Sequence, residues 1–150
     1  MYLSILIKII DLILSLILFI IISPLLLIVT LFIFFIDGLP IFFVSDRIGK
    51  NGKIFKLIKF RTMKNNNITF FGRFLRRSSI DELPQLVNIL IGHMSFVGPR
   101  PLPIEYENQI NEKNKQLRRS VTPGITGYCQ IFYNGNKRSW DEKIKYDIYF

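Results

Sequence analysis

The sequence of 150 residues has little cysteine, little histidine and few acidic side chains: one Cys, one His, and 11 Asp and Glu against 20 Lys and Arg. A single cysteine, Cys129, excludes an internal disulfide framework and is typical of a reducing compartment. A basic excess also occurs in nucleic-acid-binding proteins. Here, however, the basic residues are scattered, and no helix-turn-helix, zinc-finger or RNP-like pattern is found, so we expect no nucleic-acid partner.

Charge is absent altogether from residues 12–36, a run of 25 residues. About 20 apolar residues are enough to cross the hydrocarbon core of a bilayer. A cleaved signal peptide does not fit, because the run is longer than a typical signal-peptide core and has no small-residue cleavage site. We therefore expect residues 1–37 to anchor the protein in a membrane, with membrane lipid as a partner.

The rest of the chain, residues 38–150, carries 19 basic and 9 acidic side chains. By the positive-inside tendency, this basic segment belongs in the cytoplasm, next to the anionic headgroups of the membrane. The charge pattern therefore predicts two parts: an anchor over 1–37 and a cytoplasmic domain over 38–150.

Ser23-Pro24 divides the apolar run into two halves. Proline removes one backbone hydrogen bond and clashes with the preceding turn. The carbonyl that it frees needs a partner, which the Ser23 hydroxyl can supply. On the residues alone two alternatives stay open: a kinked helix that spans the bilayer, which the length of the run favours, and a re-entrant pair that dips into one leaflet.

A β-hairpin is predicted over 41–48 and 53–60. The two segments flank Gly49-Lys50-Asn51-Gly52, and Asn-Gly is the strongest short hairpin signal because both residues accept a positive φ. A short basic helix is expected over 72–77. A charged helix is expected over 104–119, with its final Arg118-Arg119 on a solvated face.

Asp81 and Glu82 are adjacent carboxylates before an apolar stretch. Ser79-x-x-Glu82 has the form of a capping box, but that frame puts Pro84 inside the helix, where it deletes a hydrogen bond. A helix that begins near Asp81 tolerates the proline and predicts one buried stripe, formed by Leu83, Leu86, Val87 and Leu90. In either frame the carboxylates lie at the positive end of a helix, a place that also suits anions and their metal counter-ions.

Arg100 lies between Pro99 and Pro101, which restrict its backbone to an extended form. A guanidinium on such a rigid segment is pre-organised to bind phosphate or carboxylate in bidentate fashion. Arg76 and Arg77 precede the two carboxylates and could add further positive charge. Carboxylates, arginines and a divalent metal together indicate phosphoryl transfer, in which a carboxylate can also act as the nucleophile.

The segments DELPQLVNIL, GHMSFVGPRP and TPGITG strongly resemble the bacterial sugar transferase family, the monotopic phosphoglycosyl transferases. The resemblance runs from Lys8 to the last residues and keeps the family's order of motifs. These motifs are Lys8-x-x-Asp11, Ser23-Pro24, Arg47-x-Gly49, Lys59-Phe60-Arg61-Thr62-Met63, Asp81-Glu82, Pro99-Arg100-Pro101 and Pro123-Gly124-Ile125-Thr126-Gly127.

The resemblance implies an α+β, membrane-associated fold. Its N-terminal helix would be re-entrant and broken at Ser23-Pro24, so that both flanks stay on the cytoplasmic face of the inner membrane. A mostly helical cytoplasmic catalytic domain with a small β-hairpin would follow. This implication replaces the spanning helix that composition favours, and makes the protein monotopic.

The resemblance also implies the chemistry. Asp81 would attack the β-phosphorus of a UDP-sugar, release UMP and form an aspartyl phosphosugar. Polyprenol (undecaprenyl) phosphate would then accept the phosphosugar, which starts the synthesis of a lipid-linked glycan. Glu82 would help to hold Mg²⁺ on the diphosphate. Contacts with substrate phosphates are assigned to Arg76, Arg100, Lys59 and Arg61.

The sequence departs from the family pattern in places. His93 stands where an acidic residue is usual, and Ser45 replaces a common glutamine. Members that resemble it usually continue for a few dozen residues beyond the point where this sequence stops. The alternative to an enzyme is therefore a truncated, non-catalytic membrane-anchored module that binds anionic lipid or a partner protein.

Overall fold

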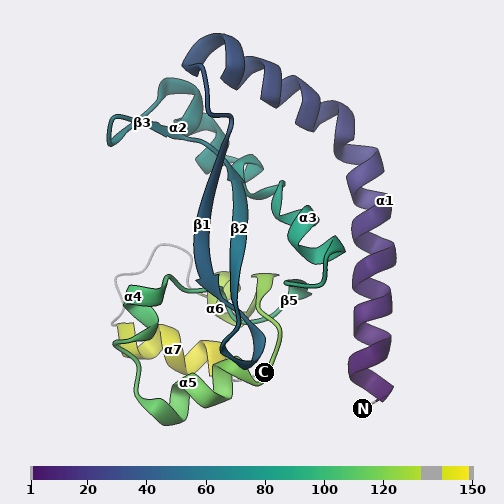
Figure 1. The fold of residues 1–150 in the computed structure, drawn as a ribbon, viewed down its shortest axis with the longest axis vertical. Coiled ribbons are helices and arrows are strands. Elements are labelled where there is room, and N and C mark those ends of the chain that lie inside the picture. Colours follow the sequence, from purple (N-terminus) through teal and green to yellow (C-terminus); the bar gives the residue numbers. More distant parts are fainter. Residues whose placement is uncertain (1, 133–139, 149–150) are drawn as a thin grey trace. The chain divides into compact units, whose positions relative to one another are not determined.

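A computed structural model describes residues 2–132 and 140–148 (Figure 1). The chain mixes helices and strands, as predicted. The elements in order are α1 (Tyr2–Phe32), the π-helix η1 (Ile33–Asp37), β1 (Phe42–Ile48), the 3₁₀ turn η2 (Lys50–Gly52), β2 (Ile54–Phe60), β3 (Met63–Lys64), β4 (Asn67–Ile68), α2 (Phe70–Arg77), the 3₁₀ turn η3 (Ile80–Glu82), α3 (Gln85–Leu90), β5 (Ser95–Val97), α4 (Ile104–Glu107), α5 (Glu112–Arg119), β6 (Gly124–Thr126), α6 (Tyr128–Phe132) and α7 (Trp140–Ile148).

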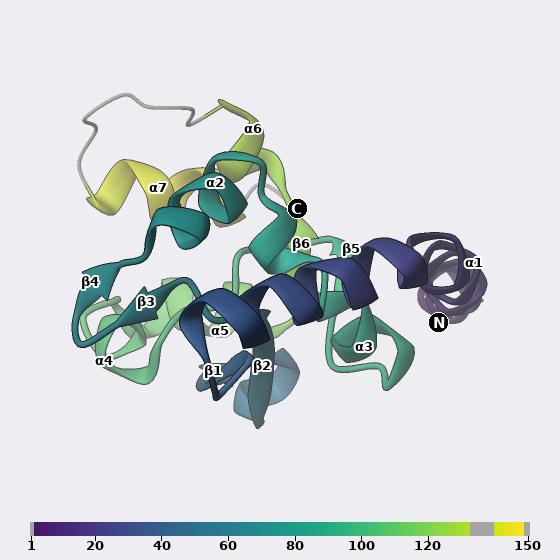
Figure 2. The ribbon, with the colours of Figure 1, turned by 90° about the horizontal axis from the view of Figure 1, so that it is seen from above.

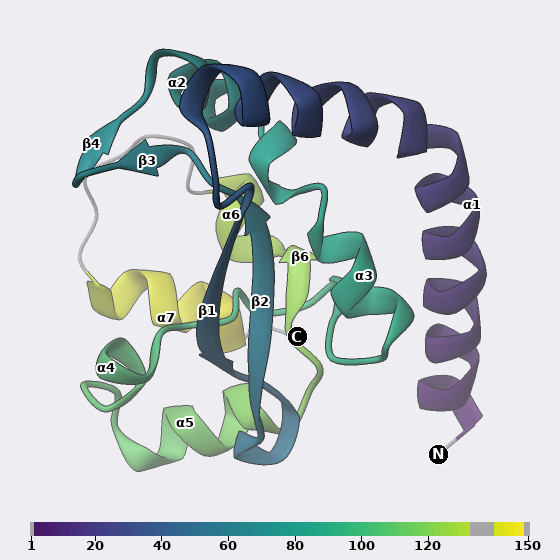
Figure 3. The same ribbon diagram turned by 45° about the horizontal axis from the view of Figure 1, so that its top comes forward.

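The apolar run forms α1, which contains Pro24 and bends (Figure 3). Seen from above, its first part is viewed nearly end-on and its second part from the side (Figure 2). The Ser23 hydroxyl donates to the Ile20 carbonyl at 2.8 Å. That carbonyl is the one that loses its usual donor to the proline, so the predicted local repair is confirmed. Within the described residues, Ile5–Asp37 is the helical stretch long and apolar enough to cross a membrane, judged by length and composition alone.

The second part of α1 is packed against the residues that follow it in the chain. Val29 and Ile33 form a buried cluster with Phe60 of β2 and Leu75 of α2. Burying four large apolar side chains contributes several kcal/mol, at about 1.5–3 kcal/mol for each. The end of the apolar helix is therefore part of the same core as β2 and α2.

The predicted hairpin is confirmed as β1 and β2, which run in opposite directions (Figure 3). Asn51 and Gly52 both have positive φ, 56° and 74°. The Lys53 amide donates to the Lys50 carbonyl across them at 3.2 Å. Asn-Gly thus occupies the two left-handed positions that a type I′ turn requires.

The segment that holds the two carboxylates differs from both predicted frames. Ser79 has a left-handed backbone and caps nothing with its side chain, so the capping box is wrong. Asp81 and Glu82 lie in the 3₁₀ turn η3, and the α-helix begins only after Pro84. Proline thus ends the turn and precedes the helix, where its missing N–H costs least. The stripe is partly confirmed: Leu86 is buried and Leu83, Val87 and Leu90 are half-buried, while Ile89 is buried too.

The predicted basic helix is present as α2, which begins two residues earlier than expected, after the cap residue Thr69. The predicted charged helix over 104–119 is two helices, α4 and α5, because Asn111 caps a new helix by accepting from the Asn114 amide at 2.9 Å. Beyond α3, β5 and β6 pair in parallel, with Ser95 opposite Gly124.

Close contacts divide the chain into two compact units. The first unit contains residues 1–45 and 57–90, and the second contains residues 46–56 and 91–150. The hairpin β1–β2 contributes to both. The boundary predicted at residue 37 is of another kind, because it divides a membrane anchor from a cytoplasmic domain. It stays a prediction.

Candidate active site

Asp81 and Glu82 lie half-buried in η3 of the first unit. Burial is the largest influence on Asp81 and raises the pKa of its carboxyl above the usual value. Lys59 lowers this pKa, Glu82 raises it, and Arg76 lowers it. A carboxylate in this position is more basic than an exposed aspartate, while two nearby cations favour its ionised form.

Glu82 accepts a charged hydrogen bond from Lys59 of β2, with 2.6 Å between Nζ and Oε1. The two side chains are only 18% and 22% exposed, so water screens the pair weakly. Strand β2 is itself tied to α3 by Asn88, whose Oδ1 accepts from the Ile58 amide at 3.1 Å. Asn88 is fully buried, and the sequence analysis missed it because an asparagine within an apolar helix gives no signal of its distant partner.

Arg76 belongs to the last turn of α2, five residues before Asp81. Its Nε donates to the Thr62 hydroxyl at 2.8 Å. Arg76 also lies close enough to Asp81 for its charge to influence the pKa of that carboxyl. The structure therefore brings three of the predicted residues, Lys59, Arg76 and Glu82, together around Asp81.

Arg61 has a different environment. Its terminal nitrogens donate to the carbonyls of Leu39 at 2.8 Å, Asp37 at 2.8 Å and Gly38 at 2.6 Å. These carbonyls follow the end of the apolar helix, where backbone acceptors have no helical partner. Lys64 adds a further contact with the Asp37 carbonyl at 3.1 Å. Arg61 thus caps the end of the apolar helix, and its contact with substrate phosphate stays a prediction.

Arg100 belongs to the second unit, where its backbone is held by a buried ion pair. Arg118 donates to the Arg100 carbonyl at 2.7 Å and pairs with Asp147 of α7. Arg118 and Asp147 are 6% and 5% exposed, so the expectation of a solvated face at Arg118 is wrong. The backbone just before this Pro-Arg-Pro segment packs closely against β6. A Cβ on Gly124 would lie 2.2 Å from the Gly98 amide nitrogen, so only glycine fits at residue 124.

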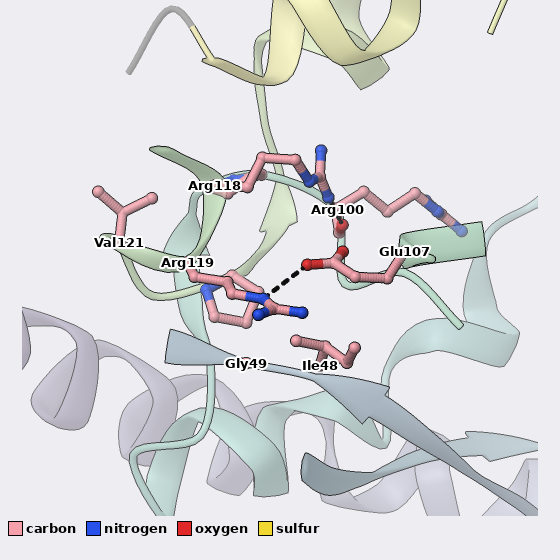
Figure 4. A pocket seen from close by; sticks show the side chains of 9 residues that line it. Ile48, Gly49, Arg100, Glu107, Arg118, Arg119 and Val121 are labelled. Carbon is pink, nitrogen blue, oxygen red and sulfur yellow. Dashed lines mark hydrogen bonds and ion pairs between the residues drawn. The ribbon is translucent and has the colours of Figure 1, made fainter. Parts of the chain in front are cut away.

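A small hollow in the second unit is lined by this same segment (Figure 4). Arg119 reaches across it to Glu107, with 2.9 Å between Nε and Oε1. Burial, and then the neighbouring Arg100, lower the pKa of Arg47 on β1. The carboxylates of Glu105 and Asp46 raise this pKa, so acidic side chains already act on the charge of Arg47.

A metal ion would have few protein ligands here. Within residues 2–132 and 140–148, no group of three or more His, Cys, Asp or Glu side chains is arranged to hold one. Mg²⁺ in phosphoryl-transfer sites is usually held by one or two carboxylates, and the substrate phosphates and water complete its shell. Asp81 and Glu82 supply two adjacent carboxylates, so the residues present fit that mode of binding.

The sequence matches the profile of the bacterial sugar transferases over residues 2–150. The chain belongs to the bacterial sugar transferase family. Among its relatives is the sugar transferase EpsL of Bacillus subtilis (strain 168), 44% identical over 126 residues, which are 75% of this chain and 61% of EpsL.

Other relatives carry names that specify a reaction. The UDP-glucose:undecaprenyl-phosphate glucose-1-phosphate transferase of Escherichia coli (strain K12) is 40% identical over 129 residues, 74% of this chain and 27% of that protein. The UDP-N-acetylgalactosamine-undecaprenyl-phosphate N-acetylgalactosaminephosphotransferase of Aeromonas hydrophila is 33% identical over 129 residues, 74% of this chain and 30% of that protein. The chain thus spans less than two thirds of each of these relatives, and their names specify different sugars.

Proposed function

We propose that the protein is a phosphoglycosyl transferase, which moves a sugar 1-phosphate from a UDP-sugar to undecaprenyl phosphate. The observation that carries this proposal is the half-buried Asp81, with raised pKa, beside Glu82, Lys59 and Arg76. Burial makes its carboxylate a stronger base and nucleophile, and the two cations keep it ionised and attract a diphosphate. The names of the relatives support the class of substrates.

In the proposed first step, a carboxylate oxygen of Asp81 attacks the β-phosphorus of the UDP-sugar. The bond from that phosphorus to the bridging oxygen breaks, and UMP leaves with the electron pair. In the second step, a phosphate oxygen of undecaprenyl phosphate attacks the aspartyl phosphosugar. The acyl–phosphate bond breaks, the product is undecaprenyl diphosphate sugar, and the Asp81 carboxylate is regenerated.

Mg²⁺ is part of the proposal, held by Glu82 with Asp81 beside it. When bound, it would neutralise charge on the diphosphate. Lys59 holds the Glu82 carboxylate in place, while Arg76 would bind phosphate oxygens. Arg100 would make the phosphate contact that the resemblance assigns to it. In sites of this class, positioning and charge neutralisation supply most of the catalysis.

The test is UMP release from UDP-glucose and UDP-N-acetylgalactosamine by the protein in lipid nanodiscs with Mg²⁺. Without acceptor, the wild type should release no more than one UMP per protein molecule and acquire the mass of a phosphosugar on Asp81. Undecaprenyl phosphate should then restore turnover. If no UMP at all is released until undecaprenyl phosphate is added, the covalent intermediate is contradicted. No release from any UDP-sugar would favour the non-catalytic module.

The proposal includes a re-entrant α1 on the cytoplasmic face of the inner membrane. Support comes from the bend at Pro24, the repair by Ser23 and the many exposed leucine, isoleucine and phenylalanine side chains along the helix. In a Cys129→Ser background, single cysteines at Lys8 and Lys64 should react with an impermeant maleimide only from the cytoplasmic side. Labelling of the two positions from opposite sides would show a spanning helix instead.

A further inference from the structure

Thr62 follows strand β2 and is buried, with only 6% of its surface exposed. Both of its polar groups face helix α2. Its hydroxyl accepts from Arg76 Nε at 2.8 Å, and its carbonyl accepts from the Thr69 amide at 3.1 Å. A hydrogen bond to a charged group contributes more to stability than one between two neutral groups.

The packing between Thr62 and α2 leaves no room for adjustment. A Cβ on Gly72 would lie 2.2 Å from the Thr62 carbonyl oxygen, so α2 can approach this closely only with glycine there. Gly72 and Arg76 are four residues apart and therefore lie on the same face of the helix. The contact that excludes a side chain at residue 72 thus brings Arg76 to the Thr62 hydroxyl one turn later.

Thr62 is held in place from the other side as well. Its neighbour Arg61 binds the carbonyls of Asp37, Gly38 and Leu39 at the end of the apolar helix. The Asp37 carboxylate accepts from the Thr69 hydroxyl at 2.9 Å, and that hydroxyl in turn caps α2. Arg61 and Thr62 therefore join the end of the apolar helix to α2.

We propose that Thr62 is a positioning residue, which orients Arg76 toward the diphosphate of the bound nucleotide. This inference rests on the proposed function. Arg76 is exposed, and an unrestrained arginine side chain loses conformational entropy when a ligand orders it. The bond from Nε to Thr62 fixes the plane of the guanidinium before the ligand arrives. The two terminal nitrogens then form the fork that binds phosphate oxygens.

The test compares Thr62→Val, which keeps the shape and removes the acceptor, with Thr62→Ser, which keeps the hydroxyl. UDP with Mg²⁺ is the probe, and its affinity is measured by titration calorimetry on the full chain in nanodiscs. Thr62→Val should weaken UDP binding about tenfold, and Thr62→Ser less than about twofold. Thermal unfolding of each variant serves as the control for folding.

A double-mutant cycle separates positioning from general stability. Arg76→Lys removes the Nε–H group that donates to the Thr62 hydroxyl. In that background, Thr62→Val should therefore change UDP affinity less than about twofold. Equal losses in both backgrounds, equal affinity of the valine and serine variants, or no UDP binding by the wild type would overturn the inference. UDP binding without UMP release would instead contradict the proposed function and leave the positioning role supported by the cycle.

Discussion

The two units of the protein hold their basic side chains in different ways. In the first unit, Arg61 and Arg76 are bound by neutral oxygens, from backbone carbonyls and a threonine hydroxyl. In the second unit, Arg118 and Arg119 are bound by the carboxylates of Asp147 and Glu107.

A carbonyl partner leaves the positive charge of an arginine in place, whereas a carboxylate partner cancels it. The exception in the first unit is Lys59, and its partner Glu82 is one of the proposed catalytic carboxylates. Under the proposed function, the uncancelled positive charge of the first unit would attract anionic substrates. In the second unit, Arg118 binds the Arg100 carbonyl and so supports the Pro-Arg-Pro segment, while Arg119 pairs with Glu107.

Of the substitutions considered, Asp81→Asn should lower activity the most. It should not lower the stability of the folded protein. Loss of the nucleophile should lower UMP release more than about a thousandfold. Because burial raises the pKa of Asp81, the folded state disfavours its ionised form, and the stability that the neutral form provides is lost as pH rises through the raised pKa.

The asparagine variant should therefore melt at the same or a higher temperature than the wild type at pH 7. That difference should vanish below about pH 3, where the wild-type carboxyl is protonated in both the folded and the unfolded state. Glu112→Gln, on the surface of α5, is the matched control and should release UMP at the wild-type rate. A variant at residue 81 that melts well below the wild type would assign a structural role to this carboxylate.

Asp147→Asn tests the structural role of the carboxylate pairs in the second unit. The substitution leaves the Arg118 charge buried without its carboxylate, which should lower the free energy of unfolding by about 3–5 kcal/mol. Chemical denaturation in detergent measures this loss. Arg118→Met combined with Asp147→Leu removes both charges and should recover most of it. If Asp147→Asn abolishes UMP release without loss of stability, the structural role assigned to the carboxylate pairs of the second unit is contradicted.

Arg61→Gln distinguishes a cap on the apolar helix from a contact with substrate. Loss of the charged bonds to carbonyls should cost about 1.5–3 kcal/mol of stability. UDP affinity, measured where the variant is fully folded, should stay within about twofold of the wild type. Lys64→Gln is the matched control and should cost less, because Lys64 makes one contact to these carbonyls. A tenfold loss of UDP affinity at unchanged stability would instead support the phosphate contact predicted for Arg61.

The smallest effect is expected for the ion pair of Glu112 and Lys115 on α5, in which the Lys115 side chain is 12% exposed. Glu112 is 76% exposed, and the ion pair joins residues three apart on one helix. Water screens a carboxylate this exposed, so the pair contributes little to stability. Glu112→Gln should therefore change the denaturation midpoint hardly at all. A loss of stability as large as that of Asp147→Asn would show that carboxylate pairing at the surface of the second unit matters as much as the buried pair.

The features that the sequence predicts correctly depend on neighbours in the chain. Asn51-Gly52 forms its turn because two adjacent residues accept positive φ. Ser23 repairs the carbonyl freed by Pro24 because the hydroxyl and the acceptor lie on one helical turn. The grouping of Lys59, Arg76 and Glu82 around Asp81 agrees with the resemblance to the family, which supplied what residue spacing could not.

The errors and omissions concern distant partners or backbone conformation. Arg118 was expected in solvent because its partner Asp147 is 29 residues away. The helix expected to begin near Asp81 begins at Gln85, and the left-handed backbone of Ser79 leads into a 3₁₀ turn that holds the carboxylates. Thr62 belongs to a family motif, but its contact with Arg76 could not be predicted, because the position of helix α2 relative to β2 is not visible in the sequence.

The cluster of Val29, Ile33, Phe60 and Leu75 also sets an order of events during synthesis. Leu75 follows Ile33 by about 40 residues, which takes about 2–8 s at 5–20 residues per second. The apolar helix therefore leaves the ribosome seconds before the side chains that will cover its end. During that interval a bilayer is the apolar environment open to it. Membrane insertion would thus precede completion of the first core, and a delay in insertion would expose the helix to aggregation.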